Sequence, residues 1–145
     1  MTKPERTPRE RYLWWCDLTT RWADNDVYGH VNNVQYHAFF DTAVNRHLID
    51  AGLLAPAHSE VIGLVVETTC SYLAPVSFPD RLQVGLRVLH LGRSSVRYET
   101  ALFRNDEALA SAVGAFVHVY VDRISQRPVP LPEPIREALR ALQAP

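Results

Sequence analysis

One polar segment of the chain concentrates the residue types that acid–base and nucleophilic chemistry uses. Residues 21–33 read RWADNDVYGHVNN and hold two carboxylates, a histidine and several carboxamides between two apolar stretches. A carboxylate such as Asp24 or Asp26 can act as a nucleophile or as a general base on water. The structural alternative is equally direct, because Asp and Asn are common turn and capping residues and Asp24 can pair with Arg21.

A helix must follow this segment and position it. Asn32 is placed as an N-cap, Gln35 can close a capping box three residues later, and Val31 and Tyr36 are spaced as a hydrophobic staple. Apolar residues then recur at helical spacing until Gly52, which is placed to end the helix as a C′ glycine. Free backbone N–H groups and the positive dipole end gather at a helix N-terminus. A site there can therefore hold developing negative charge.

The rest of the chain is predicted to be mainly strands. Apolar or alternating runs predict strands over residues 12–22, 61–72, 82–88, 96–102 and 113–121, the second of them typical of a central strand. Several prolines precede a short helix predicted over residues 135–142. One long helix followed by hairpin-linked strands predicts an α+β fold with an antiparallel sheet. Because one helix cannot cover both faces of five strands, the open face or the sheet edge is expected to meet another copy of the chain.

Length and composition indicate one globular domain over residues 1–145, with a loose lead-in over 1–11 and a Pro-rich segment with the short helix over 128–145. Hydrophobic residues make up 47% and charged residues 21%, which excludes a disordered or fibrous chain. The net charge of -1 gives no general attraction to nucleic acid or an anionic membrane. No apolar stretch has the length of a membrane-spanning helix, and the N-terminus is not typical of a signal peptide. With only two cysteines, Cys16 and Cys70, the sequence predicts neither a disulfide framework nor a bound metal. Both thiols are expected to be buried, in a protein of the reducing cytoplasm.

The polar segment also resembles a known family. The pattern Arg-Trp-x-Asp-x-Asp-x-x-Gly-His-Val-Asn-Asn-x-x-Tyr over residues 21–36 is similar to the signature of the 4-hydroxybenzoyl-CoA thioesterase-like hotdog family, and closest to its acyl-CoA thioesterase branch. Tyr72 with Pro75, and the tripeptide at residues 78–80, resemble the same family. The resemblance implies a hotdog fold, in which an antiparallel sheet wraps a long helix. It also implies homodimers paired edge to edge, tetramers in some members, and active sites at the subunit interface.

The resemblance assigns the chemistry to Asp26, which falls at the family's catalytic carboxylate. It implies an acyl-CoA thioesterase that releases free acid and coenzyme A, with Asp26 as nucleophile or general base and a helix-start amide polarising the thioester carbonyl. Coenzyme A is part of the substrate, and no separate cofactor is expected. A related branch has histidine at the position of Asn33, so a second-histidine mechanism is not expected. His30 can orient Asp26, and Asn33 can contact the thioester or a bound water, or cap the helix.

The remaining candidate residues have a binding role and an ordinary alternative. Trp22 and Tyr28 can line an acyl pocket or belong to the core. The turn formed by Arg93, Ser94 and Ser95 matches one that contacts coenzyme A phosphates in related thioesterases, and its alternative is a solvated hairpin. Asp41 corresponds to the helix on which other hotdog branches place their acid, or lies on a polar helix face.

Two other functions remain open from the sequence. A hotdog hydratase or dehydratase needs a histidine acting with a carboxylate, which His30 and Asp26 can supply. A non-catalytic acyl-CoA binding module would not need Asp26, because a bare carboxylate adds little to thioester binding. Release of free thiol, hydration of an enoyl-CoA, or binding without turnover would distinguish the three.

Overall fold

The computed structural model of the protein describes residues 5–143. In chain order its elements are β1 (Trp14–Thr19), α1 (Asn33–Asp50), β2 (Val61–Tyr72), β3 (Arg81–Leu91), β4 (Ser95–Arg104), β5 (Ala112–Asp122) and α2 (Glu133–Arg140). Short 3-10 turns cover Arg9–Arg11 and Trp22–Asp24. No helix in this part of the chain is long and apolar enough to cross a membrane.

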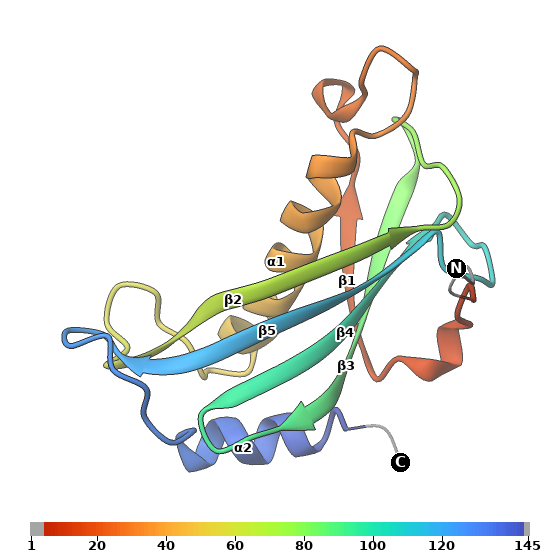
Figure 1. Cartoon of the computed structure of the whole chain (residues 1–145). Helices are drawn as coiled ribbons and strands as arrows, with labels where there is room; N and C mark the ends of the chain where they lie inside the picture. The colour runs from red at the N-terminus through yellow and green to blue at the C-terminus, as the bar shows by residue number, and fades with distance from the viewer. Residues whose placement is uncertain (1–4, 144–145) are drawn as a thin grey trace.

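The five strands form one antiparallel sheet in the order β1-β3-β4-β5-β2, and it curves around α1 (Figure 1). Alternate residues of β3 and β4, such as Leu86 and Tyr98, are fully buried in the core. The apolar stripe of α1, including Phe40 and Val44, belongs to the same core cluster. The predicted α+β architecture, a long helix wrapped by a five-stranded antiparallel sheet, is confirmed.

β2 lies at the edge of the sheet, so the central position predicted from its apolar run is wrong. It pairs only with β5, and Leu64, Val65 and Val66 remain 36%, 46% and 59% exposed. An apolar run indicates burial but does not identify the covering surface, and no further strand of the described chain covers this one. An exposed apolar edge strand is a surface for pairing with another strand.

The start of α1 follows the predicted N-cap but not the predicted capping box. Asn32 Oδ1 accepts the Val34 N–H at 3.0 Å, and the Asn32 carbonyl accepts the Gln35 N–H at 2.9 Å. The Asn32 N–H, which a capping box assigns to the Gln35 side chain, instead donates to the Asp24 carbonyl at 2.8 Å. The preceding turn therefore takes the place of the capping glutamine and joins the loop directly to the helix.

The C-terminal end of α1 agrees with the sequence prediction. Gly52 has φ of +72° and donates its N–H to the Ile49 carbonyl, while the Leu53 N–H reaches the Leu48 carbonyl at 2.8 Å. These two bonds form a Schellman motif, which favours glycine because of the positive φ. Both ends of the helix that carries the polar loop are thus defined by local sequence.

The polar loop starts earlier than predicted, because β1 ends at Thr19 and not at Trp22. The Asp24 carboxylate accepts the Arg21 backbone N–H at 2.8 Å and turns the chain into the Trp22–Asp24 3-10 turn. Aromatic and β-branched composition does not report this capping bond, so composition alone predicts the strand too long.

The two ends of the chain lie against the sheet where they are described. Residues 1–4 of the predicted lead-in lie outside the described part. Beyond them, Arg6 Nε donates to the Ala110 carbonyl at 2.8 Å and Arg9 Nε donates to the Glu107 carbonyl at 2.7 Å, so the described part of this stretch is held and not loose. The predicted C-terminal helix is confirmed as α2, which lies beside the turn between β3 and β4 (Figure 1).

The capping arrangement leads to a stability prediction. Replacing Asn32 with Ala should lower the free energy of unfolding by about 1 kcal/mol, because the Val34 N–H loses its side-chain acceptor. Gln35→Ala is the matched control and should change stability much less, since the capping-box donor is already occupied. Urea unfolding of both variants measures this, and equal losses would mean that the Gln35 side chain does cap the helix.

Candidate active site

Asp26 opens the tight turn of a small hairpin that connects the 3-10 turn to α1. Asn25 and Val31 form an antiparallel bridge at its base. The Asp26 N–H donates to the His30 carbonyl at 2.9 Å, and the Gly29 N–H donates to the Asp26 carbonyl at 3.1 Å. Gly29 has φ of +80°, a conformation that glycine adopts without steric cost. The glycine of the sequence pattern therefore allows the turn that presents Asp26.

The Asp26 side chain is half-buried and bonded on one oxygen only. Its Oδ1 accepts the Tyr28 backbone N–H at 2.9 Å in an Asx-type turn. Within the described residues no group donates to Oδ2. One oxygen thus fixes the orientation of the carboxylate, and the other can accept a proton or approach a substrate atom.

A pocket of about 470 Å³ lies beside this turn. Its wall comes from the loop, the first turn of α1 and the segment that follows β2. The lining residues are Asp26, Tyr28, His30, Val31, Asn33, Tyr36, Tyr72, Leu73, Ala74 and Pro75. The structure therefore brings together four predicted site residues, namely Asp26, Tyr28, His30 and Asn33.

Two tyrosines form the aromatic wall of the pocket. The rings of Tyr36 and Tyr72 pack edge-on with centroids 4.9 Å apart. Tyr72 donates its hydroxyl to the Asn33 carbonyl at 3.1 Å, and His37 Nε2 lies 3.4 Å from the same hydroxyl. Burial raises the pKa of Tyr36 to about 12 and also raises that of Tyr72, so both phenols stay protonated at neutral pH. They supply neutral, partly apolar surface to whatever the pocket holds.

Tyr72 and His37 are not among the site residues that the sequence predicts. In the sequence, Tyr72 is notable only because it belongs to the family resemblance. His37 lies on the predicted helix, and nothing in its spacing or surroundings predicts a role for it. Tyr72 meets both Asn33 and His37 because β2 returns along α1 and brings its C-terminal end to the start of the helix. The contact with Asn33 joins residues 39 apart in the sequence, so local pattern alone does not reveal it.

In the described chain, the backbone at the start of α1 has one N–H group without an acceptor, and it belongs to Asn33, a residue that lines the pocket. The N–H groups of Val34 and Gln35 are already used by Asn32. Among the described residues, the Asn33 N–H has no acceptor. Of the helix-start N–H groups that the sequence predicts to be free, only that of Asn33 is free in the described residues. It lies at the positive end of the helix dipole.

Asp24 has a structural role and differs sharply from its neighbour Asp26. It is only 1% exposed, and Arg21 binds its carboxylate through Nε at 3.1 Å and a terminal nitrogen at 2.8 Å. The Asp24 carbonyl also receives the Asn32 N–H. A carboxylate whose oxygens are both engaged is held in place, which leaves Asp26 as the available acid of the loop.

Within a single chain, Trp22 neither lines this pocket nor belongs to the core. It is 77% exposed and packs edge-on against Phe78 with ring centroids 6.1 Å apart. The 3-10 turn that begins at Trp22 directs the chain away from the strand, so the indole is not carried into the core. Tyr28 lines the pocket but is 82% exposed, so it forms the rim rather than a closed acyl wall.

The turn formed by Arg93, Ser94 and Ser95 lies at the opposite end of the sheet from Asp26 (Figure 1). The eleven residues of β3 separate the two ends, which corresponds to roughly 33 Å of strand. The Arg93 carbonyl accepts the Leu131 N–H at 2.8 Å, which fixes the turn, and the Arg93 side chain is exposed. A single chain therefore does not bring this turn and Asp26 together.

Comparisons with known proteins identify the family. The model of the thioesterase-like superfamily matches residues 20–139. The chain is 57% identical to a Pseudomonas aeruginosa PAO1 protein of known structure, covering 97% of this chain and 98% of that one, with a TM-score of 0.94. It is 34% identical to a Thermus thermophilus thioesterase solved with coenzyme A and zinc, covering 92% and 97% of the two chains, with a TM-score of 0.77.

A curated relative agrees with these structures. The chain is 28% identical to the 1,4-dihydroxy-2-naphthoyl-CoA hydrolase of Synechococcus sp. strain CC9605, with 88% of this chain and 91% of that protein covered. The family match spans β2 to β5, the long helix and the loop that carries the carboxylate. The chain therefore belongs to the thioesterase-like superfamily and is a thioester hydrolase with the hotdog fold.

Proposed function

We propose that the protein hydrolyses an acyl-CoA thioester to the free acid and coenzyme A, with Asp26 as the carboxylate that carries the reaction. The observation that supports this most is the position of Asp26, whose free oxygen lies at the pocket beside the start of α1. The relatives named for a CoA thioester and for a coenzyme A complex support the substrate class.

The Asp26 carboxylate can hydrolyse the thioester by either of two routes. As a nucleophile, Asp26 adds to the thioester carbonyl carbon, the C–S bond breaks, coenzyme A leaves as a thiolate, and water hydrolyses the resulting anhydride. As a general base, Asp26 takes a proton from water while the water oxygen adds to the same carbon; the tetrahedral intermediate then breaks its C–S bond, releasing the free acid and the coenzyme A thiolate, and Asp26 passes its proton to that thiolate or to solvent. In both cases negative charge develops on the carbonyl oxygen, and the free Asn33 N–H is the donor we assign to it.

His30 and Asn33 complete the reactive end of the pocket. The His30 carbonyl holds the Asp26 N–H at 2.9 Å, so His30 orients the turn through its backbone while its side chain lines the pocket. Asn33 occupies the position where a related branch has histidine, and its side chain can contact the thioester or a water. The Tyr28 rim receives the acyl group, and no separate cofactor is part of the proposal.

We further infer a homodimer, or a tetramer built from it, that pairs β2 edges. The exposed apolar residues of β2 lie at an unpaired sheet edge that continues to Tyr72 at the pocket. The Arg93–Ser95 turn of one chain would then bind the coenzyme A phosphates at the site of its neighbour.

Cys16 and Cys70 are both free thiols, which supports a location in the reducing cytoplasm.

The dimer has a direct test in sedimentation. The wild-type protein should sediment at micromolar concentration as twice the chain mass or a multiple of it, and Val66→Asp should shift it toward the monomer with loss of turnover. Leu13→Asp is the control, because Leu13 is 47% exposed next to β1, at the other edge of the sheet. A wild-type monomer with full activity would contradict the proposal.

Asp26 has the sharpest test. Asp26→Asn keeps the size and the Tyr28 N–H contact but removes the charge and the basic oxygen, so kcat for acyl-CoA hydrolysis should fall at least about 100-fold. Free-thiol release measures this, and thermal unfolding checks that the variant is folded. Asp41→Asn is the matched control, because Asp41 is exposed on α1 and should leave turnover unchanged.

The activities of Asp26→Asn and Asp41→Asn together decide which carboxylate carries the reaction. If Asp41→Asn were inactive and Asp26→Asn active, the catalytic carboxylate would lie on the helix. If both variants hydrolysed every thioester that the wild type accepts, the carboxylate mechanism would be wrong.

Coenzyme A binding has a separate test at Arg93. Arg93→Ala should raise KM about tenfold with little change in kcat, since it removes a charged donor for phosphate and no reacting group. The wild-type KM should rise with salt, and the variant should respond less. Arg11→Ala removes the same charge from an exposed arginine elsewhere and serves as control. An unchanged KM in Arg93→Ala would place the phosphates at another surface.

A further inference from the structure

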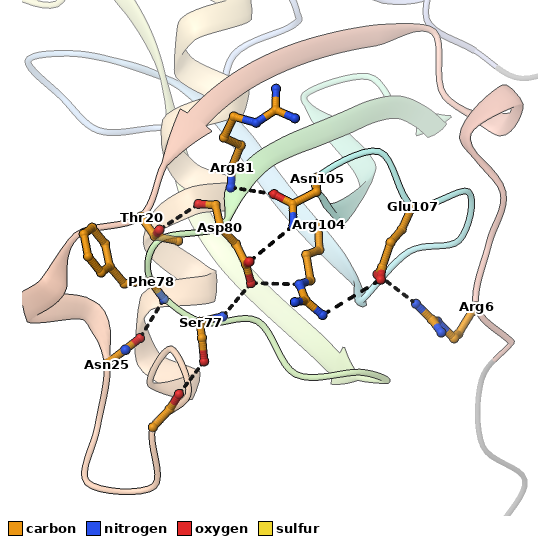
Figure 2. A network of polar contacts seen from close by, with 11 residues as sticks. Arg6, Thr20, Asn25, Ser77, Phe78, Asp80, Arg81, Arg104, Asn105 and Glu107 are labelled. Carbon is orange, nitrogen blue, oxygen red and sulfur yellow. Dashed lines mark hydrogen bonds and ion pairs between the residues drawn. The ribbon is translucent and has the colours of Figure 1, made fainter.

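A network of hydrogen bonds and ion pairs centred on Asp80 adjoins the loop that carries Asp26 (Figure 2). The side chain of Asp80 is 11% exposed and has partners from three segments. Its Oδ2 accepts the Ser77 N–H at 2.9 Å and lies 2.9 Å from Arg104 Nε in an ion pair. Its Oδ1 accepts the Asn105 amide at 3.2 Å, and its carbonyl accepts the Thr20 hydroxyl at 2.7 Å.

The segment held by Asp80 is the one that contacts the Asp26 hairpin. The Ser77 hydroxyl donates to the Gly29 carbonyl, at the end of the turn that begins with Asp26. The Phe78 N–H donates to Asn25 Oδ1 at 3.0 Å, at the base of the hairpin (Figure 2). The Val31 N–H donates to the Val76 carbonyl at 2.8 Å. Three consecutive residues of one segment thus hold the two arms and the turn of the hairpin.

We propose that Asp80 is a positioning residue for the hydrolysis: by holding Ser77 and Phe78 against the hairpin, it keeps the Asp26 carboxylate at the pocket. This inference rests on the proposed function, in which Asp26 is the reacting carboxylate. Asp80 does not line the pocket and touches no reacting atom in this assignment. It acts only through the Ser77–Phe78 segment.

The network needs a charged carboxylate and not merely a polar side chain. The two carboxylate oxygens accept hydrogen bonds from a backbone N–H and an amide, and one of them also forms an ion pair with a guanidinium. Burial by itself would raise the pKa of Asp80, but the Ser77 N–H, the Asn105 amide and the Arg104 guanidinium outweigh it and lower the pKa below its usual value. Asp80 is therefore ionised at neutral pH. An asparagine would turn an N–H group toward one of these donors.

The test combines kinetics with amide hydrogen exchange of the full chain. Asp80→Asn should lower kcat about 10- to 100-fold and leave KM within about twofold, because a small misplacement of the reacting group acts on the chemical step. Amides of residues 25–31 should exchange several-fold faster than in the wild type. Asp122→Asn is the matched control: Asp122 also accepts two backbone N–H groups, from Ile124 and Ser125, but beyond β5. It should change neither quantity.

Two further variants separate positioning from stability. Arg104→Gln should reproduce the loss of kcat and Arg104→Lys should restore most of it, because lysine keeps the charge beside Asp80. Ser77→Ala removes the contact to Gly29 while leaving the Ser77 N–H to Asp80, and should speed exchange in residues 25–31 even if Asp80→Asn folds poorly.

The outcomes distinguish this inference from the proposed function. Faster exchange in residues 25–31 with a normal kcat in Asp80→Asn would overturn the positioning role. A lower melting temperature with unchanged exchange and unchanged kcat would overturn it as well, since Asp80 would then be purely structural. If the wild type released no thiol from any acyl-CoA, the proposed function would be wrong. Independently of that result, unchanged amide exchange of residues 25–31 in Asp80→Asn and Ser77→Ala would reject the positioning contact.

Discussion

Backbone polar groups of the loop before α1 need partners, and this requirement determines where the Asp26 carboxylate lies. The Asn32 N–H is satisfied by Asp24, the Val31 N–H by Val76 and the Asp26 N–H by His30. These acceptors come from the 3-10 turn, from the segment before β3 and from the hairpin itself. Because the sheet fixes the first two, the loop inherits its geometry from the sheet although it contains no long regular element.

The same loop divides two carboxylates between two roles by the partners it gives them. A buried carboxylate is costly unless its oxygens are paired, and Asp24 meets that condition through Arg21. A reacting carboxylate needs an oxygen that is not paired, and Asp26 retains one at the pocket. Two residues apart in sequence, one acid stabilises the turn and the other is presented by it.

Much of this architecture follows from local signals in the sequence. Gly52 marks the end of α1 because a positive φ is needed there, and alternating apolar residues locate β3, β4 and β5 within a few positions. The Asp26 loop is recognisable because carboxylates, carboxamides and a glycine are crowded before a helix cap. These features depend on neighbours in the chain, and a pattern of neighbours is what a sequence displays.

Features that depend on distant segments are missed or misplaced by the same patterns. The apolar run of β2 predicts burial but not its edge position, which is set by the order of pairing. The length of β1 and the orientation of Trp22 are a local exception, because they depend on a hydrogen bond between the Asp24 side chain and the Arg21 backbone that composition does not display. The role of Tyr72 arises only where β2 returns to the start of α1. Sequence pattern describes what each residue prefers, and these outcomes are decided by which segments meet.

The length of β3 has a genetic consequence in the proposed dimer. The strand holds the carboxylate loop and the arginine turn of one chain roughly 33 Å apart, so in that proposed dimer each reaction centre would draw Asp26 from one subunit and Arg93 from the other. A mixed dimer of one chain lacking Asp26 and one lacking Arg93 then contains one intact centre beside one that lacks both groups. If the dimer is as proposed, two defective alleles of the gene would complement each other when expressed together, which two alleles of a monomeric hydrolase cannot do.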